Sequence, residues 1–170
     1  MESIDSEEVS IIDVLSEGPI STSVLRSFAV WCAERVRHLV EASPEYDLDP
    51  EAPARFTHAL EVAAREARGC ASPEELEAAR RGAVDQRSAG SGWWPGHLAD
   101  AGAFRSAAHM AARFACRGTC QKDAAIAAIL SSQRTAWAVG YLAASTGGIE
   151  DQAVNAETAE HIRELRRRMG

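Results

Sequence analysis

Apolar residues recur at spacings of three and four over most of this chain, a pattern typical of helices with one buried face. The clearest example lies between about Thr22 and Ala42. The spacing predicts a helix in this range, with a buried face that comprises Leu25, Phe28, Cys32, Val36 and Leu39.

Start and stop signals divide the rest of the chain into further helices. Asp49 and Pro50 are expected to cap and open a second helix, which Gly69 ends. Ser72 and Glu75 have the spacing of a capping box, because the serine can accept from the third helical amide while the glutamate reaches back. Three later segments follow the same pattern: one from Phe104 that Gly118 ends, a long one through Ile126 that Gly147 ends, and one from about Ile149.

The sequence therefore predicts an all-α fold, a single helical domain over residues 1–170 built as a bundle of five or six helices. Alanine runs such as AAHMAARFA favour helices that pack closely, because the side chains between them are small. Residues 1–20 are expected to form an acidic N-terminal arm or a short helix, and residues 88–99 a loop rich in Gly, Trp and Pro.

The composition is that of a globular protein, with 46% hydrophobic and 25% charged residues among 170. No run approaches the roughly 20 apolar residues that span a bilayer, and MESIDSEEVS lacks the regions of a signal peptide. We expect no membrane partner, a cytoplasmic location, and four cysteines that stay reduced.

Acidic residues are concentrated in the first part of the chain. The net charge is −7, with a balance of −9 over residues 1–61 and +2 over the remainder. This distribution argues against nucleic-acid binding and favours a protein partner with basic patches, although an acidic surface can also serve solubility alone.

Two segments are the candidate partner-binding surface. The segment SPEYDLDPEAP contains three prolines, so its acids Glu45, Asp47 and Asp49 are expected in an exposed loop where they can attract a basic partner. Trp93 and Trp94 lie side by side between glycine and proline, and a loop cannot easily cover both rings. Tryptophan is enriched where proteins bind one another, although one ring can instead fill the bundle.

A column of basic residues is a candidate anion-binding site. Arg105, His109, Arg113 and Arg117 are spaced by four, so they follow one another along a helix and can hold a phosphate or an acidic partner. The alternative is a solvated face, or one neutralised by the acidic part of the same protein.

Metal binding and catalysis have weaker support in the sequence. Cys116 and Cys120, with His97 and His109 upstream, do not have the spacing of a zinc finger, and buried thiols are the favoured interpretation. Glu157 and His161 are expected to be a surface pair. We expect no catalytic residue, no metal and no cofactor, and hence not an enzyme.

The stretch VWCAERVRHLVEASPEYDLDPEAPARFTHALEVAAREARG places a helix, an acidic proline-containing loop and an alanine-rich helix in series. It resembles the N-terminal half of an immunity protein family of bacterial polymorphic toxin systems, often numbered family five. The resemblance spans roughly residues 25–145. Its matching positions are Trp31, Cys32, Ala33, Asp49, Pro50 and Ala59, and it departs where the family has histidines and this chain has Gln133, Thr135 and Trp137.

The resemblance implies a non-catalytic protein that binds and neutralises a cognate toxin. Two alternatives remain open from the residues themselves. One is a helical regulatory or self-assembling module, which light scattering at several concentrations would distinguish. The other is a metal- or anion-binding helical protein.

Overall fold

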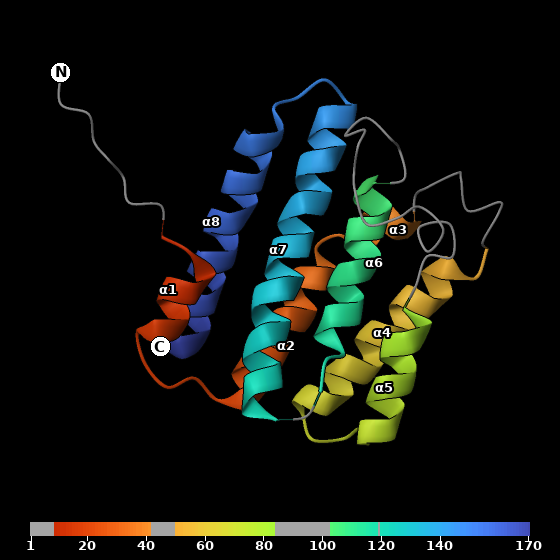
Figure 1. Ribbon diagram of the computed structural model, residues 1–170, viewed down its shortest axis with the longest axis vertical. Coiled ribbons are helices and arrows are strands. Elements are labelled where there is room, and N and C mark those ends of the chain that lie inside the picture. The colour runs from red at the N-terminus through yellow and green to blue at the C-terminus, as the bar shows by residue number, and fades with distance from the viewer. Residues whose placement is uncertain (1–8, 42–49, 84–102, 119) are drawn as a thin grey trace.

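A computed structural model describes residues 9–41, 50–83, 103–118 and 120–170 of the chain, with side chains from 107 onward in the third range (Figure 1). About 80% of the described residues are helical and none lies in a strand, which confirms the all-α prediction. The helices are α1 (Ile11–Ser16), α2 (Thr22–Glu34), α3 (Arg37–Glu41), α4 (Ala52–Ala67), α5 (Pro73–Gly82), α6 (Ala103–Ala115), α7 (Gln121–Ser145) and α8 (Glu150–Met169).

The predicted number of five or six helices is wrong, because the described part of the chain contains more. Helix α1 begins where Ser10 and Asp13 form a capping box, so the N-terminal arm includes a short helix. The helix predicted over residues 22–42 is interrupted by a turn at Arg35 and Val36, which separates α2 from α3. If α2 and α3 are counted as one interrupted helix, the described segments still number seven.

Helix α7 is the central element of the described fold. It packs against α2, α6 and α8, while α4 and α5 lie on the far side of α6 and α1 lies against α8 (Figure 1). Alanine accounts for the close packing, because its methyl group adds little thickness between neighbouring helices. The alanines that α6 and α7 bury include Ala108, Ala111, Ala112, Ala124, Ala127 and Ala128.

Two clusters of buried side chains form the core. The first joins α2, α3, α4, α5, α6 and α7 around Phe56, and the second joins α1, α2, α7 and α8 around Phe28. Both phenylalanines are fully buried. Trp31 and Trp137 are partly buried and pack at the edges of these clusters.

Several helix ends follow the sequence signals. Ser72 accepts from the Glu75 amide at 3.2 Å and Glu75 accepts from the Ser72 amide at 2.9 Å, which confirms the predicted capping box. Gly69 adopts a φ of 71°, in the left-handed region that glycine allows at the end of a helix. Helix α4, however, begins after Glu51, so the cap expected at Asp49 and Pro50 lies before the actual start. None of the described helices is long and apolar enough to cross a membrane.

Candidate functional site

A hollow of about 300 Å³ opens between α5, the end of α6 and the start of α7. Arg80 reaches it from the last turn of α5, and Arg113 and Phe114 from the last turn of α6. Arg117 lies just after α6, and Asp123 lies in the first turn of α7. Three elements thus bring three guanidinium groups, one aromatic ring and one carboxylate around the same space.

Arg80 is held in place by a neighbour on its own helix. Its Nε and Nη2 donate to Glu77 at 2.6 and 2.7 Å, and Arg81 donates to the same carboxylate at 2.7 Å. The hydrogen bonds from Arg80 and then Arg81 lower the pKa of Glu77 to about 2, and the Glu77 hydrogen bond raises the pKa of Arg80. The two bonds from Arg80 do not use its Nη1, which therefore stays available to a ligand.

A buried arginine holds the turn that contains Arg117 through hydrogen bonds to its backbone. Arg26 of α2 is 2% exposed and donates to the carbonyl groups of Arg117 and Gly118. Gly118 has a φ of 44°, and the Asp123 side chain occupies the space that a Cβ at Gly118 would need. Only glycine fits this position, so the backbone at Gly118, next to Arg117, is constrained.

The charges around the hollow leave a positive excess. Arg117 Nε lies 3.5 Å from Asp123 Oδ1, and the Cys120 thiol hydrogen bond helps to lower the pKa of Asp123. Among the described residues, Arg113 enters no hydrogen bond or ion pair. Three guanidinium groups therefore line the hollow with one carboxylate, that of Asp123, on a chain whose overall charge is −7. Glu77 lies outside the lining and is shared by Arg80 and Arg81.

The predicted basic column is only partly a shared surface. Arg113 and Arg117 line the hollow, but His109 is 2% exposed and packs edge-on against Phe56, with 5.6 Å between ring centroids. Residues spaced by four drift by about 40° per step, because a turn takes about 3.6 residues. The drift turns His109 toward the core. Arg105 belongs to α6, but its side chain lies outside the described residues.

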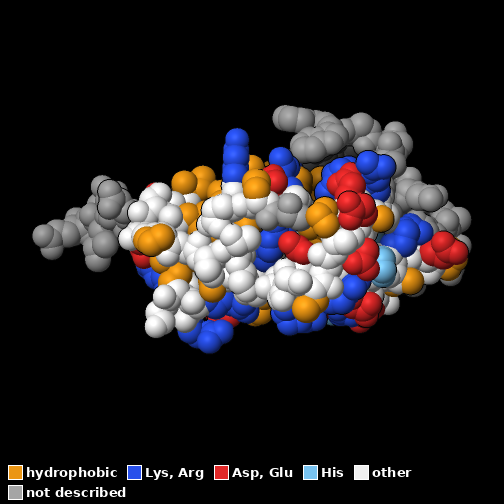
Figure 2. Space-filling view, turned by 90° about the horizontal axis from the view of Figure 1, so that it is seen from below, with side chains coloured by type: hydrophobic (Ala, Val, Ile, Leu, Met, Phe, Trp, Pro, Cys, Tyr) orange, Lys and Arg blue, Asp and Glu red, His pale blue; other side chains and the backbone are white. Residues whose placement is uncertain are grey.

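The predicted partner-binding residues Glu45, Asp47, Asp49, Trp93 and Trp94 all lie outside the described residues. The charges that are described do not form one acidic and one basic half. Figure 2 shows acidic and basic side chains interspersed over the face that it draws.

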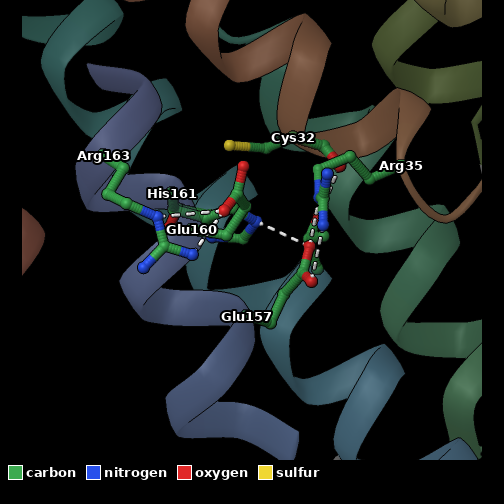
Figure 3. Close-up of polar contacts among 8 residues, drawn as sticks. Cys32, Arg35, Glu157, Glu160, His161 and Arg163 are labelled. Atoms are coloured by element: carbon green, nitrogen blue, oxygen red, sulfur yellow. Dashed lines mark hydrogen bonds and ion pairs between the residues drawn. The ribbon is translucent and has the colours of Figure 1, made fainter. Parts of the chain in front are cut away.

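A second group of polar side chains, mostly buried, joins α7 and α8 to the end of α2 (Figure 3). Ser132 Oγ lies 2.8 Å from His161 Nδ1, and His161 Nε2 lies 3.0 Å from Glu157 Oε1. Arg35, in the turn directly after α2, completes the chain by donating from Nε and Nη2 to the two oxygens of Glu157. We call these four residues the buried polar chain.

This finding corrects the prediction of a surface pair at Glu157 and His161. Glu157 is 9% exposed and His161 fully buried, because α8 turns this face toward α2 and α7. Burial alone would raise the pKa of Glu157, but the hydrogen bonds from Arg35 and His161 outweigh it and bring the pKa to about 2. Glu157 is therefore ionised at neutral pH.

The buried polar chain contains the residue types of a Ser–His–acid triad but is closed to a substrate. Ser132 is 3% exposed, and the rings of Phe28 and Trp31 stand edge-on to His161 at 6.4 and 5.7 Å. Next to it, the Thr135 hydroxyl donates to the Cys32 carbonyl at 2.9 Å. These contacts tie α7 and α8 to α2.

The two cysteines considered for metal binding have separate environments. Cys116 is buried, its thiol donates to the Ala59 carbonyl at 3.1 Å, and burial raises its pKa to about 12. Cys120 is exposed and caps α7. No group of three or more metal-ligating side chains occurs among the described residues, and His97 lies outside them.

The sequence did not predict the hollow or the buried polar chain, because the residues that form each of them are distant along the chain. Arg80 reaches the hollow from a different helix than Arg113, and Ser132 meets His161 across 29 positions. Helical periodicity reports which face a residue occupies and not which other helix it meets. The i,i+4 spacing of Glu157 and His161 was the one local signal of the buried polar chain.

Comparisons with known proteins add no further constraint. No family model matches this chain, and no curated protein or solved structure is significantly similar to it.

Proposed function

We propose that this chain is a non-catalytic protein-binding inhibitor, an immunity protein that neutralises a cognate bacterial toxin. The assignment to immunity proteins rests on the resemblance of residues 25–145 to that family. A binding role is also supported by the buried polar side chains Ser132, His161 and Glu157, because they bond to one another and join helices.

The single observation that carries the binding role is the buried polar chain. It links α2, α7 and α8 by bonds between side chains that are nearly all inaccessible, so the helices form a preorganised body. A rigid surface loses little conformational entropy on association, which favours tight and specific protein binding. The acids Glu45, Asp47 and Asp49 and the rings of Trp93 and Trp94 are the proposed contact groups.

The test begins with the reading frames beside this chain's gene: any one whose product stops growth when it is expressed alone is co-expressed with this chain. We expect this chain to restore growth of cells that make that product, and the two purified proteins to form a stable complex. Failure of both, with each protein folded by circular dichroism, would overturn the inhibitor assignment. Concentration-dependent light scattering of the chain alone would instead favour the self-assembling module.

We propose anion binding as a second candidate function, which the arginine hollow specifically favours. Its three guanidinium groups exceed the carboxylates that face them, and Arg113 has no charged partner among the described residues. Titration calorimetry at low ionic strength tests this function, because binding of phosphate or sulfate should release or absorb heat. The Arg113→Gln variant should lose that heat.

A further inference from the structure

We propose that the arginine hollow binds a small phosphate monoester, with the phosphate on Arg80, Arg113 and Arg117 and the organic group against Phe114. This inference rests on the second proposed function, anion binding, and is independent of the immunity role. It adds the class of ligand, and it adds Arg80, which the basic column predicted from the sequence did not include.

The arrangement of donors favours a tetrahedral anion. Arg113 offers its whole guanidinium fork, whereas Arg80 and Arg117 are each partly engaged and offer their remaining N–H groups. The three come from two separate segments, the end of α5 and the end of α6 with its following turn. A carboxylate has two oxygens in one plane and suits one fork, while a phosphate has three terminal oxygens that can accept from several directions.

The hollow's size and its wall favour a small ester over a free ion or a folded partner. Its volume of about 300 Å³ lies at the lower end of small-molecule sites, which span roughly 300–1,000 Å³. Phe114 supplies an apolar wall beside the charged groups, and Arg134 lies over the Phe114 ring at 5.9 Å. A phosphate attached to a compact ring or sugar would use both the donors and this wall.

Two features keep the site in shape without a ligand. Glu77 holds Arg80 through two hydrogen bonds, and Arg26 anchors the carbonyl groups of the turn that carries Arg117. The Asp123 carboxylate forms an ion pair with Arg117 and therefore competes with a bound anion for that guanidinium group. Removing the Asp123 charge should strengthen anion binding, whereas removing an arginine charge should weaken it.

The experiment is titration calorimetry of the full chain at low ionic strength with phenyl phosphate, inorganic phosphate, sulfate and benzoate. We expect phenyl phosphate to bind most tightly and benzoate most weakly. Arg113→Gln and Arg80→Gln should each weaken phenyl phosphate binding by about tenfold or more, as is typical when a charge-assisted hydrogen bond is lost. Asp123→Asn should strengthen it.

The matched control is Arg163→Gln, which removes the same charge from an exposed position of α8 where the side chain is 67% accessible. It should leave phenyl phosphate affinity within about twofold, because Arg163 is not among the residues that line the hollow and pairs with Glu160 instead. Circular dichroism checks that every variant is folded. An equal loss in Arg163→Gln and Arg113→Gln would place binding outside the hollow and overturn the inference.

The remaining outcomes separate this inference from the function on which it rests. If no anion binds at millimolar concentration, both anion binding and the phosphate ester are refuted. If sulfate, benzoate and phenyl phosphate bind equally and depend on Arg113, anion binding stands and the phosphate monoester is refuted.

Discussion

Glu157 is the residue on which the buried polar chain depends most. It accepts from Arg35 and His161 and is nearly inaccessible, so its charge is balanced only while α2 and α8 stay together. The sequence showed the spacing of Glu157 and His161 but not their burial. The missing information was the position of Ser132 in α7 and of Arg35 just after α2, which approach this pair only in the folded chain.

Replacement of Glu157 by glutamine should destabilise the protein by about 2–3 kcal/mol, because a largely buried charge pair with Arg35 is broken. The loss falls at the lower end for such pairs because the Arg35 side chain is 34% exposed and regains some hydration. Urea denaturation of both proteins measures the difference. Glu160→Gln, which breaks an exposed pair with Arg163 on the same helix, is the control and should change stability by less than about 1 kcal/mol. Equal effects would contradict a structural role for the buried polar chain.

Acid should remove the contribution of Glu157. Its pKa in the folded protein is about 2, below the ordinary value of 4.5 that applies in the unfolded chain, so the folded state favours the charged form. The contribution is fully present above pH 4.5 and is lost as the pH falls from there toward 2. Its upper limit is about 3 kcal/mol, since each pKa unit corresponds to about 1.4 kcal/mol.

The measurement for this pH dependence is the difference in unfolding free energy between wild type and Glu157→Gln at several pH values. That difference should shrink on acidification below pH 4.5. Glu77 and Glu164 also have pKa values of about 2, but both proteins contain them, so their effects cancel. A difference that stays constant down to pH 2 would show that Glu157 does not have the lowered pKa.

The sequence predicted best those helix ends that depend on local capping signals. The capping box at Ser72 and the end of α4 at Gly69 depend on residues within a few positions, so a single sequence contains the whole signal. No proline or glycine near Arg35 and Val36 indicates in the sequence that the helix breaks there. The break follows from the packing of α3 against α4 and α6, which is tertiary information.

Helices α7 and α8 approach each other closely at Gly140. A Cβ at Gly140 would lie 2.5 Å from Cγ2 of Val154 and 3.2 Å from Cγ of Glu150, so α7 and α8 would have to separate or shift. Gly140→Ala should therefore destabilise the protein by about 1–3 kcal/mol despite the better helix propensity of alanine. Thermal unfolding measures the change.

Gly82 is the matched control because it also lies in a helix and a Cβ there meets nothing within 4 Å. Gly82→Ala should raise stability by a few tenths to about 1 kcal/mol, since alanine restricts the unfolded chain without strain. If both variants were stabilised, the close approach of α7 and α8 would not exist in solution.

At the scale of the whole molecule, the distribution of charge links the sequence to the proposed partner. The first 61 residues have a balance of −9, whereas the hollow near α5, α6 and α7 has a positive excess. The acids Glu45, Asp47 and Asp49 and the arginines of the hollow would recognise groups of opposite sign. The acids are therefore the proposed contact for a partner with basic patches, and the hollow is the proposed site for a small anion.

The acids Glu45, Asp47 and Asp49 should set the rate of association with the proposed toxin. Replacement of Glu45, Asp47 and Asp49 by their amides should lower the association rate constant and flatten its dependence on salt, because opposite potentials accelerate encounter. Surface-binding kinetics at two salt concentrations measure both effects. Neutralising Glu74, Asp151 and Glu160 changes the net charge equally and should have a smaller effect, since these acids lie on other parts of the chain.

The tryptophan pair should set the lifetime of the same complex. A tryptophan at the centre of an interface contributes roughly 2 kcal/mol or more, chiefly by slowing dissociation. Trp93→Ala or Trp94→Ala should therefore raise the dissociation rate constant by about thirtyfold, with association little changed. The variant that has no effect identifies the ring that faces the bundle instead. The tryptophan variants and the variant without the three acids could all stay folded and bind with unaltered rates. The proposed toxin would then contact another surface. The Arg113→Gln and Arg117→Gln variants of the hollow are the next to compare in the same assay.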